Sequence, residues 1–299
     1  MKQIQTVWVV GAGALGSVLA ALLHKSGKAQ TYLVGASPHW QKVARDGLLL
    51  ETYGQGEELL PVTTRAWDQV PPLGSTDLVL LSGKATDLPQ VADQLGPRLG
   101  EGAAVFTLQN GLGVRELAGR LLGRPVEAGV AFFGARSVEP GRVAFYGPGR
   151  LVLTPGEASR ALGDFLPGES LKCEQAQDYP QAEWYKLAVN CLANPLAGIL
   201  NQPNHQLNSE LLDPAKEALL TEVKAVAKAE GIEVELSVAK FNRILKGPNV
   251  PSLRTDLDRG RPSEIDFLNG AIVELAAKHG IPVPANQLVT SLIRFLTRG

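Results

Sequence analysis

The chain has 299 residues, a length that suits one large domain or two medium-sized domains. Its apolar content of 44% and charged content of 20% are ordinary for a globular protein, and no apolar tract reaches the ~18 residues of a membrane span. The 29 basic and 30 acidic residues give a net charge of −1 without a basic excess in either half, so we expect no nucleic-acid partner.

Cysteine and histidine usage narrows the class of protein further. The 2 cysteines cannot form a disulfide framework, which favours a reducing compartment. The 4 histidines lie far apart without the spacing of metal ligands, so no metal site is expected. The N-terminus runs directly into an apolar strand, unlike a signal peptide. These features predict a cytoplasmic protein.

The chain begins with a predicted strand, a glycine loop and a helix. Residues 4–10 are mostly apolar and predict the strand, and Gly11-Ala12-Gly13-Ala14-Leu15-Gly16 follows. A helical pattern then continues to Ser26, with Gly27 as its C-cap. A short strand at residues 31–34 completes a β-α-β unit.

The glycine spacing in this context predicts a dinucleotide-binding loop. Gly11 permits a tight turn, Gly13 lets a pyrophosphate approach backbone N–H groups, and Gly16 allows close packing of strand and helix. The helix N-terminus offers its dipole and its free amides to the diphosphate. A glycine-rich turn without a nucleotide is the alternative, but the position between strand and helix favours the dinucleotide.

The residues after the second strand bear on the choice of cofactor. NAD-selective loops usually carry an acidic residue about 20 positions after the glycines, where it holds the ribose hydroxyls. The segment 33–37 has no Asp or Glu, and because an acidic residue would repel a 2′-phosphate, its absence favours NADP (NADPH). No arginine lies there to bind the phosphate, so Ser37, His39 and Lys42 are the candidate substitutes.

Further apolar runs, punctuated by Gly and Pro, continue the alternation of strands and helices. The expected strands are residues 78–82, 103–108 and 126–133, with additional antiparallel strands at 143–146 and 150–153. Lys84 and Asn110 each follow a strand, where ligands bind in parallel sheets, and both could face the nicotinamide side of the cofactor. Taken alone, they are better explained as a surface lysine and a turn asparagine.

The pattern becomes helical from about residue 178 onward. The expected helices span 179–200, 210–231, 235–246, 263–279 and 285–297. The predicted fold class is therefore α/β, with an N-terminal Rossmann-type doubly wound sheet in residues 1–176 followed by an all-α C-terminal domain in residues 177–299. We expect the two domains to share a cleft.

Three polar residues, Lys186, Asn190 and Asn194, are spaced four apart in the otherwise apolar segment 184–196. On a helix these positions lie along one face. The helix should therefore be buried, with its polar stripe facing a cavity that a polar molecule enters. A buried lysine needs a carboxylate, a ligand or a catalytic task, because burial of an unpaired ammonium is costly. The alternative is a lysine that extends to the surface while the asparagines cap backbone groups.

A second group of polar residues lies in the segment 251–270. Ser252 and Glu264 flank an expected loop, and Glu264 lies in the first turn of the expected helix 263–279. A carboxylate is favoured at that position by the helix dipole alone, so this residue by itself indicates no function.

Four segments in order resemble the ketopantoate reductase (2-dehydropantoate 2-reductase) family almost end to end. They are the glycine loop, Gln109-Asn110-Gly111-Leu112-Gly113, the run Lys186-Leu187-Ala188-Val189-Asn190 with Asn194-Pro195, and Ser252 with Glu264-Ile265-Asp266. The third and fourth segments together are highly characteristic. The family commonly has an arginine near Gly35, where this chain has none.

The resemblance implies a role for each matching residue. Lys186 matches the proton donor, and Glu264 matches an essential carboxylate next to the lysine and the cofactor. The expected cofactor-binding residues are Gly11, Ala12, Gly13, Ala14, Leu15, Gly16, Lys84, Asn110, Ala135 and Glu264. The expected substrate-binding residues are Asn110, Asn190, Asn194, Asn204 and Ser252.

The expected reaction is the NADPH-dependent reduction of 2-dehydropantoate to (R)-pantoate, a step toward pantothenate and coenzyme A. Addition of a hydride to the carbonyl carbon leaves an alkoxide, which needs a proton. A lysine ammonium whose pKa lies near neutral pH is a suitable acid for this step. Two alternatives remain: a reductase of another 2-oxo acid, ketone or imine, and a non-catalytic NADP(H)-binding sensor. The helical half could support a homodimer, although no exposed apolar stripe is clear enough in the sequence to name.

Overall fold

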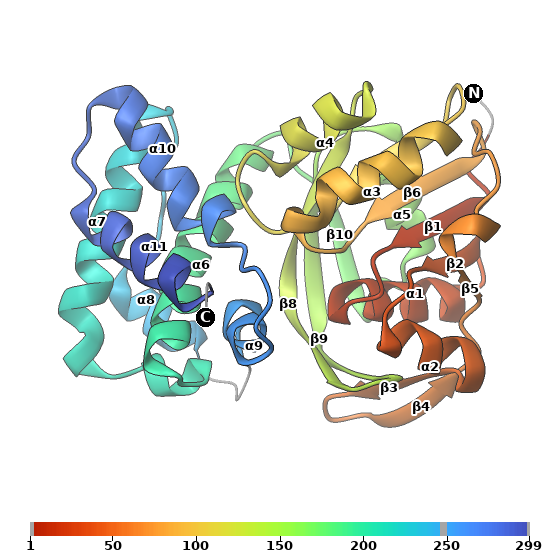
Figure 1. The fold of residues 1–299 in the computed structure, drawn as a ribbon, viewed down its shortest axis with the longest axis horizontal. Helices are drawn as coiled ribbons and strands as arrows, with labels where there is room; N and C mark the ends of the chain where they lie inside the picture. The colour runs from red at the N-terminus through yellow and green to blue at the C-terminus, as the bar shows by residue number, and fades with distance from the viewer. Residues whose placement is uncertain (1–2, 246–249, 298–299) are drawn as a thin grey trace. The chain divides into compact units, whose positions relative to one another are not determined.

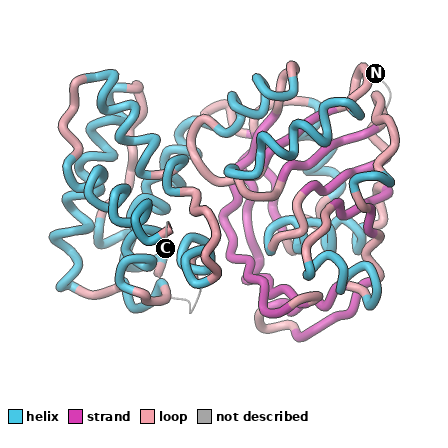
Figure 2. The backbone as a smooth tube through the Cα atoms, viewed as in Figure 1, coloured by secondary structure: helices cyan, strands magenta, loops and turns pink. Residues whose placement is uncertain are grey.

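The computed structural model describes residues 3–245 and 250–297. The chain divides into two compact units, one made of Met1–Gln109 with Val114–Tyr179 and the other of Asn110–Gly113 with Pro180–Gly299. The described strands all belong to the first unit, and the second is built from helices and loops (Figures 1 and 2). The expected α/β fold class with a helical second half is confirmed.

A parallel sheet forms the centre of the first unit. Its strands are β1 Thr6–Val10, β2 Gln30–Val34, β5 Thr64–Arg65, β6 Asp77–Leu81, β7 Ala104–Thr107 and the start of β8 Glu127–Glu139. They lie in the order β5-β2-β1-β6-β7-β8, all parallel, which is the doubly wound order with its switch point between β1 and β6. Ligands in such sheets bind beyond the carboxyl ends of the strands at the switch point.

The strand β1 is apolar on both faces because helices cover the sheet on both sides. Val7 and Val9 pack into the main core together with residues of α1 Ala14–Ser26, and Trp8 and Val10 are buried on the opposite face. The other helices of this unit are α2 Pro38–Asp46, α3 Leu88–Leu95, α4 Val114–Leu122 and α5 Glu157–Phe165. A strand buried on both faces needs a continuous apolar run, which explains the composition of residues 7–10.

A mixed extension continues the sheet beyond β8. It contains β9 Arg142–Leu153, β3 Leu48–Thr52, β4 Gly56–Leu60 and β10 Leu171–Gln175, to give a 10-stranded sheet. The pairs β8–β9 and β3–β4 are antiparallel, and the pairs β9–β3 and β9–β10 are parallel. The two short strands expected at 143–146 and 150–153 are one continuous strand, antiparallel to β8 as expected. Pro148 lies within this strand, at the point where the pairing of β9 with β8 shifts register opposite Phe133. A proline is tolerated there because the hydrogen-bond pattern between the two strands is interrupted and needs no N–H donor.

The helical unit is organised around α6 Tyr179–Leu200, whose bounds agree with the expected helix. Its other helices are α7 Asp213–Ala229, α8 Val238–Ile244, α9 Ser252–Asp258, α10 Asn269–His279 and α11 Pro284–Leu296. The apolar side of α6, including Leu187, Ala188 and Leu192, forms one core with residues of α7, α10 and α11. Among the described residues, no helix is both long and apolar enough to span a lipid bilayer.

Several expected helix bounds are wrong. The segment 210–231 begins with the 3-10 turn Glu210–Leu212, and α8 begins only after Ser237, whose side chain accepts the N–H of Lys240 at 3.1 Å. The expected end at residue 246 lies outside the described residues. The expected helix 263–279 is interrupted at Leu268, which separates the 3-10 turn Ile265–Phe267 from α10.

The expected loop after Ser252 is in fact the helix α9. Its residues Leu253 and Leu257 are one turn apart, and both belong to an apolar cluster with Ile265, Ile293 of α11 and Ile199 of α6. The burial of this short apolar pair stabilises a helix that is too short for a clear periodic signal.

Residues 110–113 group with the helical unit although they follow β7 in the chain. The N–H of Leu112 donates to the carbonyl of Phe267 at 2.9 Å, and the Leu112 side chain packs on the helical core. Gly111 has a φ of +114°, and an added Cβ would lie 2.5 Å from the Cβ of Phe267. The expected division into residues 1–176 and 177–299 did not anticipate this segment.

Candidate active site

The glycine loop follows β1 at the switch point of the sheet, and its geometry explains two of its glycines. Gly11 has a φ of +109°, and an added Cβ would overlap the backbone of Gly83. An added Cβ at Gly16 would overlap the carbonyl of Gly11 and the side chain of Ser82. These two positions therefore allow the loops after β1 and β6 and the start of α1 to pack closely.

Gly13 is open, in contrast to its neighbours. Among the described atoms, none lies within 4 Å of a Cβ placed at Gly13. This residue precedes α1, and within the described residues no side chain caps that helix and no acidic residue lies in its first turn. The open approach and the uncapped N–H groups of Ala14, Leu15 and Gly16 fit a diphosphate group.

The loops after β6 and β7 are tied together by polar contacts. The Ser82 hydroxyl shares its one hydrogen between the carbonyls of Val10 at 3.1 Å and Gly11 at 3.2 Å. The Gln109 amide donates to the carbonyls of Gly83 at 3.2 Å and Lys84 at 2.9 Å. Lys84 is thus held by its backbone at the carboxyl end of β6, as expected from the sequence.

Two further residues expected at the cofactor are partly buried. Ala135 lies in β8 opposite Phe145, and Asn110 belongs to the loop that groups with the helical unit. Ser82 has no distinctive signal in the sequence, and Gln109 enters there only as the first residue of the family-like segment 109–113.

The three candidate substitutes for a phosphate-binding arginine all have protein partners. The Ser37 hydroxyl accepts the N–H of Trp40 at 3.2 Å and so caps α2. His39 lies with one ring nitrogen 3.0 Å from the Ser17 hydroxyl, and its other ring nitrogen, Nδ1, accepts the N–H of Gly141 at 3.1 Å. Burial lowers the pKa of His39, so this imidazole is neutral at pH 7.

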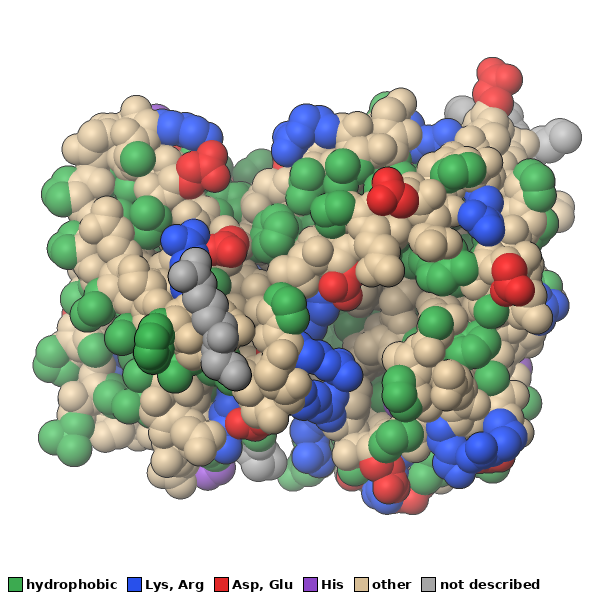
Figure 3. All heavy atoms as spheres, in the orientation of Figure 1, with side chains coloured by type: hydrophobic (Ala, Val, Ile, Leu, Met, Phe, Trp, Pro, Cys, Tyr) green, Lys and Arg blue, Asp and Glu red, His purple; other side chains and the backbone are tan. Residues whose placement is uncertain are grey.

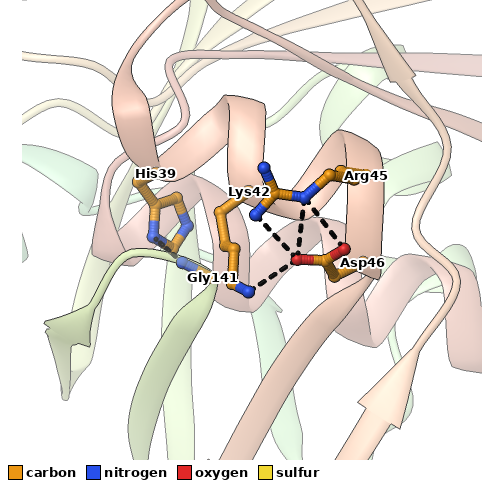
Figure 4. Close-up of polar contacts among 5 residues, drawn as sticks. All are labelled: His39, Lys42, Arg45, Asp46 and Gly141. Atoms are coloured by element: carbon orange, nitrogen blue, oxygen red, sulfur yellow. Dashed lines mark hydrogen bonds and ion pairs between the residues drawn. The ribbon is translucent and has the colours of Figure 1, made fainter.

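Lys42 points to a carboxylate of its own helix. Its Nζ lies 2.6 Å from Asp46, which also accepts the guanidinium of Arg45 at 3.1 Å, and Figure 4 shows both cations converging on this one carboxylate. Hydrogen bonds from Arg45 and Lys42 lower the pKa of Asp46 to about 2. Ser37, His39 and Lys42 therefore have structural roles around α2.

An arginine that the sequence did not indicate lies beside the end of β2. Arg65 ends β5 and pairs in register with Val34, and its carbonyl accepts the N–H of Gly35 at 3.4 Å. Its guanidinium lies 4.8 Å from the centre of the Tyr32 ring. The strand β5 has only two residues, so no periodic pattern could predict its place next to Gly35.

The polar stripe of the helical unit lies on α6. Lys186, Asn190 and Asn194 are on one helical face, with Asn194 only 8% exposed and the other two partly buried. Burial lowers the pKa of Lys186 to about 8. An ammonium with such a pKa is charged at pH 7 yet gives up a proton far more readily than a surface lysine.

The remaining expected site residues lie in the same unit with different exposure. Asn204 begins the 3-10 turn Asn204–Leu207, and its buried Oδ1 has no hydrogen-bond partner within the described part of the chain. Ser252 is exposed at the first position of α9. Glu264 is 5% exposed and precedes the turn Ile265–Phe267, so its expected place in the first turn of a long helix is wrong.

Burial distinguishes Glu264 from an ordinary helix-capping carboxylate. A carboxylate that is kept almost fully buried needs polar or charged partners, because its desolvation is costly. Among the described residues, no group of three or more His, Cys, Asp or Glu side chains could hold a metal ion.

The fold and these two groups of residues define a nicotinamide-dinucleotide-dependent oxidoreductase with a helical second unit. The family model described as "Ketopantoate reductase PanE/ApbA" matches residues 7–158, and "Ketopantoate reductase PanE/ApbA C terminal" matches residues 178–297. The chain therefore belongs to the ketopantoate reductase family, as its motifs predicted.

Individual relatives agree over nearly the whole chain. The 2-dehydropantoate 2-reductase of Vibrio cholerae is 30% identical over 297 residues, which is 96% of each chain. The crystal structure of a PanE/ApbA family ketopantoate reductase from Ralstonia eutropha JMP134 has a TM-score of 0.87 at 31% identity and covers 99% of both chains. A D-mandelate dehydrogenase with NADH and anilino(oxo)acetate has a TM-score of 0.87 at 25% identity, covering 98% of this chain and 99% of its own.

Proposed function

We propose that the protein catalyses the NADPH-dependent reduction of 2-dehydropantoate (ketopantoate) to (R)-pantoate, in pantothenate and coenzyme A biosynthesis. The observation that carries the proposal is Lys186, a partly buried lysine of lowered pKa on the polar stripe of α6, in a chain that matches the family over both units. In this proposal residues 1–176 are the dinucleotide-binding domain and residues 177–299 are the substrate-binding and catalytic domain.

The first unit binds the cofactor through the loop Gly11 to Gly16. The open space at Gly13 and the uncapped start of α1 support a diphosphate at this position. Lys84, Ala135, Asn110 and Glu264 complete the proposed cofactor contacts. When bound, the reduced nicotinamide supplies a hydride to the carbonyl carbon of the substrate.

Arg65 supports a preference for NADPH over NADH. It is the arginine beside the end of β2, at the position where dinucleotide-binding folds hold the ribose that carries the 2′-phosphate. Its guanidinium lies against the Tyr32 ring, and Nη1 donates to the Thr64 carbonyl at 3.0 Å, so the other N–H groups are the ones that can donate to an anion. Arg65 thus substitutes for the family arginine that is missing near Gly35.

Lys186 is the proton donor in this proposal. Its ammonium hydrogen-bonds to the carbonyl oxygen of the substrate and draws electron density toward that oxygen. As hydride reaches the carbon, Lys186 Nζ transfers its proton to the oxygen and becomes a neutral amine. The Glu264 carboxylate balances the charge of the ammonium and orients it.

The asparagines recognise the substrate. Asn190, Asn194, Asn204 and Asn110 can donate N–H groups to a carboxylate and accept a hydrogen bond from a hydroxyl. Ser252 adds a hydroxyl that can do either. The Oδ1 atom of Asn204 is buried and has no hydrogen-bond partner among the described residues. Because buried polar atoms are normally hydrogen-bonded, this supports a hydrogen bond from a ligand at this atom.

The test follows NADPH oxidation on addition of ketopantoate by the wild type and by Lys186→Ala. We expect the variant to lose about 100-fold or more of kcat, because a positioned general acid contributes that much, while NADPH still binds. Lys228→Ala, at an exposed position of α7, is the matched control and should keep full activity. An unimpaired Lys186→Ala variant would refute the assignment of the proton donor.

A panel of other 2-oxo acids, ketones and imines, run beside ketopantoate, tests the substrate. Faster turnover of another panel member than of ketopantoate by the wild type would overturn the substrate assignment while keeping the reaction type.

We also propose that the protein is a cytoplasmic homodimer. The support for a dimer is an apolar stripe on α11, made of Leu288, Leu292, Phe295 and Leu296, which are 40–76% exposed. Hydrophobic side chains are visible at the surface of the helical unit in Figure 3. An exposed apolar stripe of this kind is favourable at an interface between subunits. The support for the cytoplasm is that both cysteines, Cys173 and Cys191, are free.

A further inference from the structure

The helix α6 contains a proline in its interior, one residue after Asn194 of the polar stripe. Pro195 has no N–H, so it cannot donate to the carbonyl of Cys191, the residue four positions earlier. This carbonyl lies between Asn190 and Asn194 in the chain, in a part of the helix where both neighbouring turns are buried. A buried carbonyl requires a donor from elsewhere.

Asn269 supplies that donor. It is the first residue of α10 and is fully buried, and its Nδ2 donates to the carbonyl of Cys191 at 3.0 Å. A side chain that follows the proline by more than seventy positions in sequence thus makes the bond that Pro195 removes.

A buried chain of hydrogen bonds fixes the orientation of this amide. Asn269 Nδ2 also donates to Asn286 Oδ1 at 2.9 Å, and Asn286 Nδ2 donates to Glu222 at 2.7 Å and to the carbonyl of Leu219 at 3.3 Å. Glu222 in turn accepts the backbone N–H groups of Ala285 at 2.8 Å and Asn286 at 2.9 Å, which caps α11. A rotation of either amide by 180° would place its oxygen against the carbonyl oxygen that its Nδ2 now contacts. The N–H groups of both amides are therefore fixed in their present directions.

The position of the repaired bond matters for the polar stripe. Interior prolines are the commonest cause of a helix bend, and the bend depends on what occupies the freed carbonyl. Lys186 and Asn190 precede the freed carbonyl of Cys191, whereas Asn194 follows it and the turn that carries Asn204 comes after the helix. The angle at this point therefore sets the distance between the two halves of the stripe.

We propose that Asn269 is a positioning residue that replaces the backbone donor lost at Pro195 and thereby holds Lys186, Asn190 and Asn194 in one arrangement. The inference rests on the proposed function, since only then do these three side chains act on one substrate. Asn269 touches neither substrate nor cofactor in this role, and it acts through the backbone of α6.

The experiment compares Asn269→Leu with the double variant Asn269→Leu/Pro195→Ala. Leucine removes the donor, and alanine at position 195 restores a backbone N–H that can bond to the Cys191 carbonyl within the helix. The lost bond to Asn286 is common to both variants, so a difference between them reports on the Cys191 carbonyl alone. Pro195→Ala by itself is the control and should resemble the wild type, because Asn269 already occupies the carbonyl.

Two quantities are measured for each variant: kcat/KM for the 2-oxo acid, and the affinity for NADPH. We expect Asn269→Leu to lose roughly 10- to 100-fold in kcat/KM, because a small displacement of catalytic groups lowers the rate by about this factor. The affinity for NADPH should be unchanged. The double variant should recover most of that loss. Equal activity of Asn269→Leu and the wild type, or no recovery in the double variant, would overturn the proposal. If Asn269→Leu does not fold, Asn269→Ser takes its place in both variants, because serine is too short to reach the carbonyl.

Hydrogen exchange of the α6 amides separates this inference from the proposed function. If the wild type does not turn over ketopantoate, the proposed function fails, but exchange can still be measured. Faster exchange around residues 190–198 in the single variant, reversed in the double variant, supports the positioning role. Identical exchange in the two variants contradicts it whatever the substrate is.

Discussion

Lys186 shows how the surroundings of one residue set its chemistry. Burial in α6 lowers the pKa of its ammonium to about 8, because removal from water disfavours the charged form. Trp184, Leu187 and Ala188 around it are buried and supply the apolar surroundings. The same residue on an exposed face would hold its proton too tightly to be an efficient acid near neutral pH.

The first prediction concerns the pH dependence of the reaction. The active form of Lys186 is the protonated one, so kcat should be constant below the pKa and fall as pH rises through about 8. The measurement is the pH profile of kcat for the wild type at saturating substrate. A profile that remains flat from pH 6 to about 10 would be inconsistent with Lys186 as the acid.

Arg65 carries the second prediction. Arg65→Ala should raise KM for NADPH about tenfold and leave KM for NADH unchanged, because only NADPH has the 2′-phosphate that the guanidinium binds. Arg136→Ala, at an exposed position of β8 in the same unit, is the control for loss of a positive charge. An equal effect on both cofactors would assign Arg65 a structural role at the Tyr32 ring instead.

At the scale of elements, the glycine loop divides its functions between positions. Gly11 and Gly16 let two loops and a helix pack together, whereas the space beside Gly13 is open in the described structure. Substitutions at these sites should therefore separate folding from cofactor binding.

The third prediction tests that separation. Gly13→Val should fold with near wild-type stability but lose NADPH binding, because its side chain would occupy the approach of the diphosphate. Gly16→Ala should instead lower the unfolding midpoint, because its Cβ would overlap the Gly11 carbonyl. Thermal unfolding and NADPH fluorescence titration measure the two effects. If Gly13→Val binds NADPH normally, the loop does not hold the diphosphate.

The fourth prediction concerns the buried lysine that anchors the turn carrying Asn204. Lys216 of α7 is fully buried, and its Nζ donates to the carbonyls of Leu207 and Ser209, both at 3.1 Å, and to Asn242 Oδ1 at 2.7 Å. Lys216→Met should cost about 2–4 kcal/mol of unfolding free energy in urea, since these acceptors lose their donor. Lys228→Met is the exposed control, and a loss no greater than that control would show that water replaces the ammonium.

The fifth prediction concerns the whole molecule: the exposed apolar stripe of α11 should hold two copies of the chain together as a homodimer. The chain mass is 31.8 kDa, so a homodimer should sediment at about twice that mass. The double variant Leu288→Lys/Phe295→Lys should sediment as a monomer, because two charges would be buried in the interface. Leu211→Lys alters an isolated exposed leucine and should remain a dimer. A monomeric wild type would contradict the proposed dimer.

How much could be predicted from the sequence depended on the range of the interactions involved. The bounds of α6 agree with the expected helix because its apolar pattern is long and regular. The sequence predicts a loop where the structure has α9, because this helix is short and depends on an apolar cluster of Leu253 and Leu257 with Ile293, which lies far along the chain. The sequence likewise does not indicate that the segment 110–113 groups with the helical unit, because its contact with Phe267 is equally distant in the chain.

The fold class, the family, the glycine loop and the common helical face of Lys186, Asn190 and Asn194 can all be inferred from the sequence alone. Each of these follows from spacing within a contiguous segment, where local geometry decides. Only the tertiary structure brought Arg65 next to Gly35 and Asn269 to the carbonyl of Cys191. Such pairings depend on how strands and helices pack across long separations, and no local pattern records them.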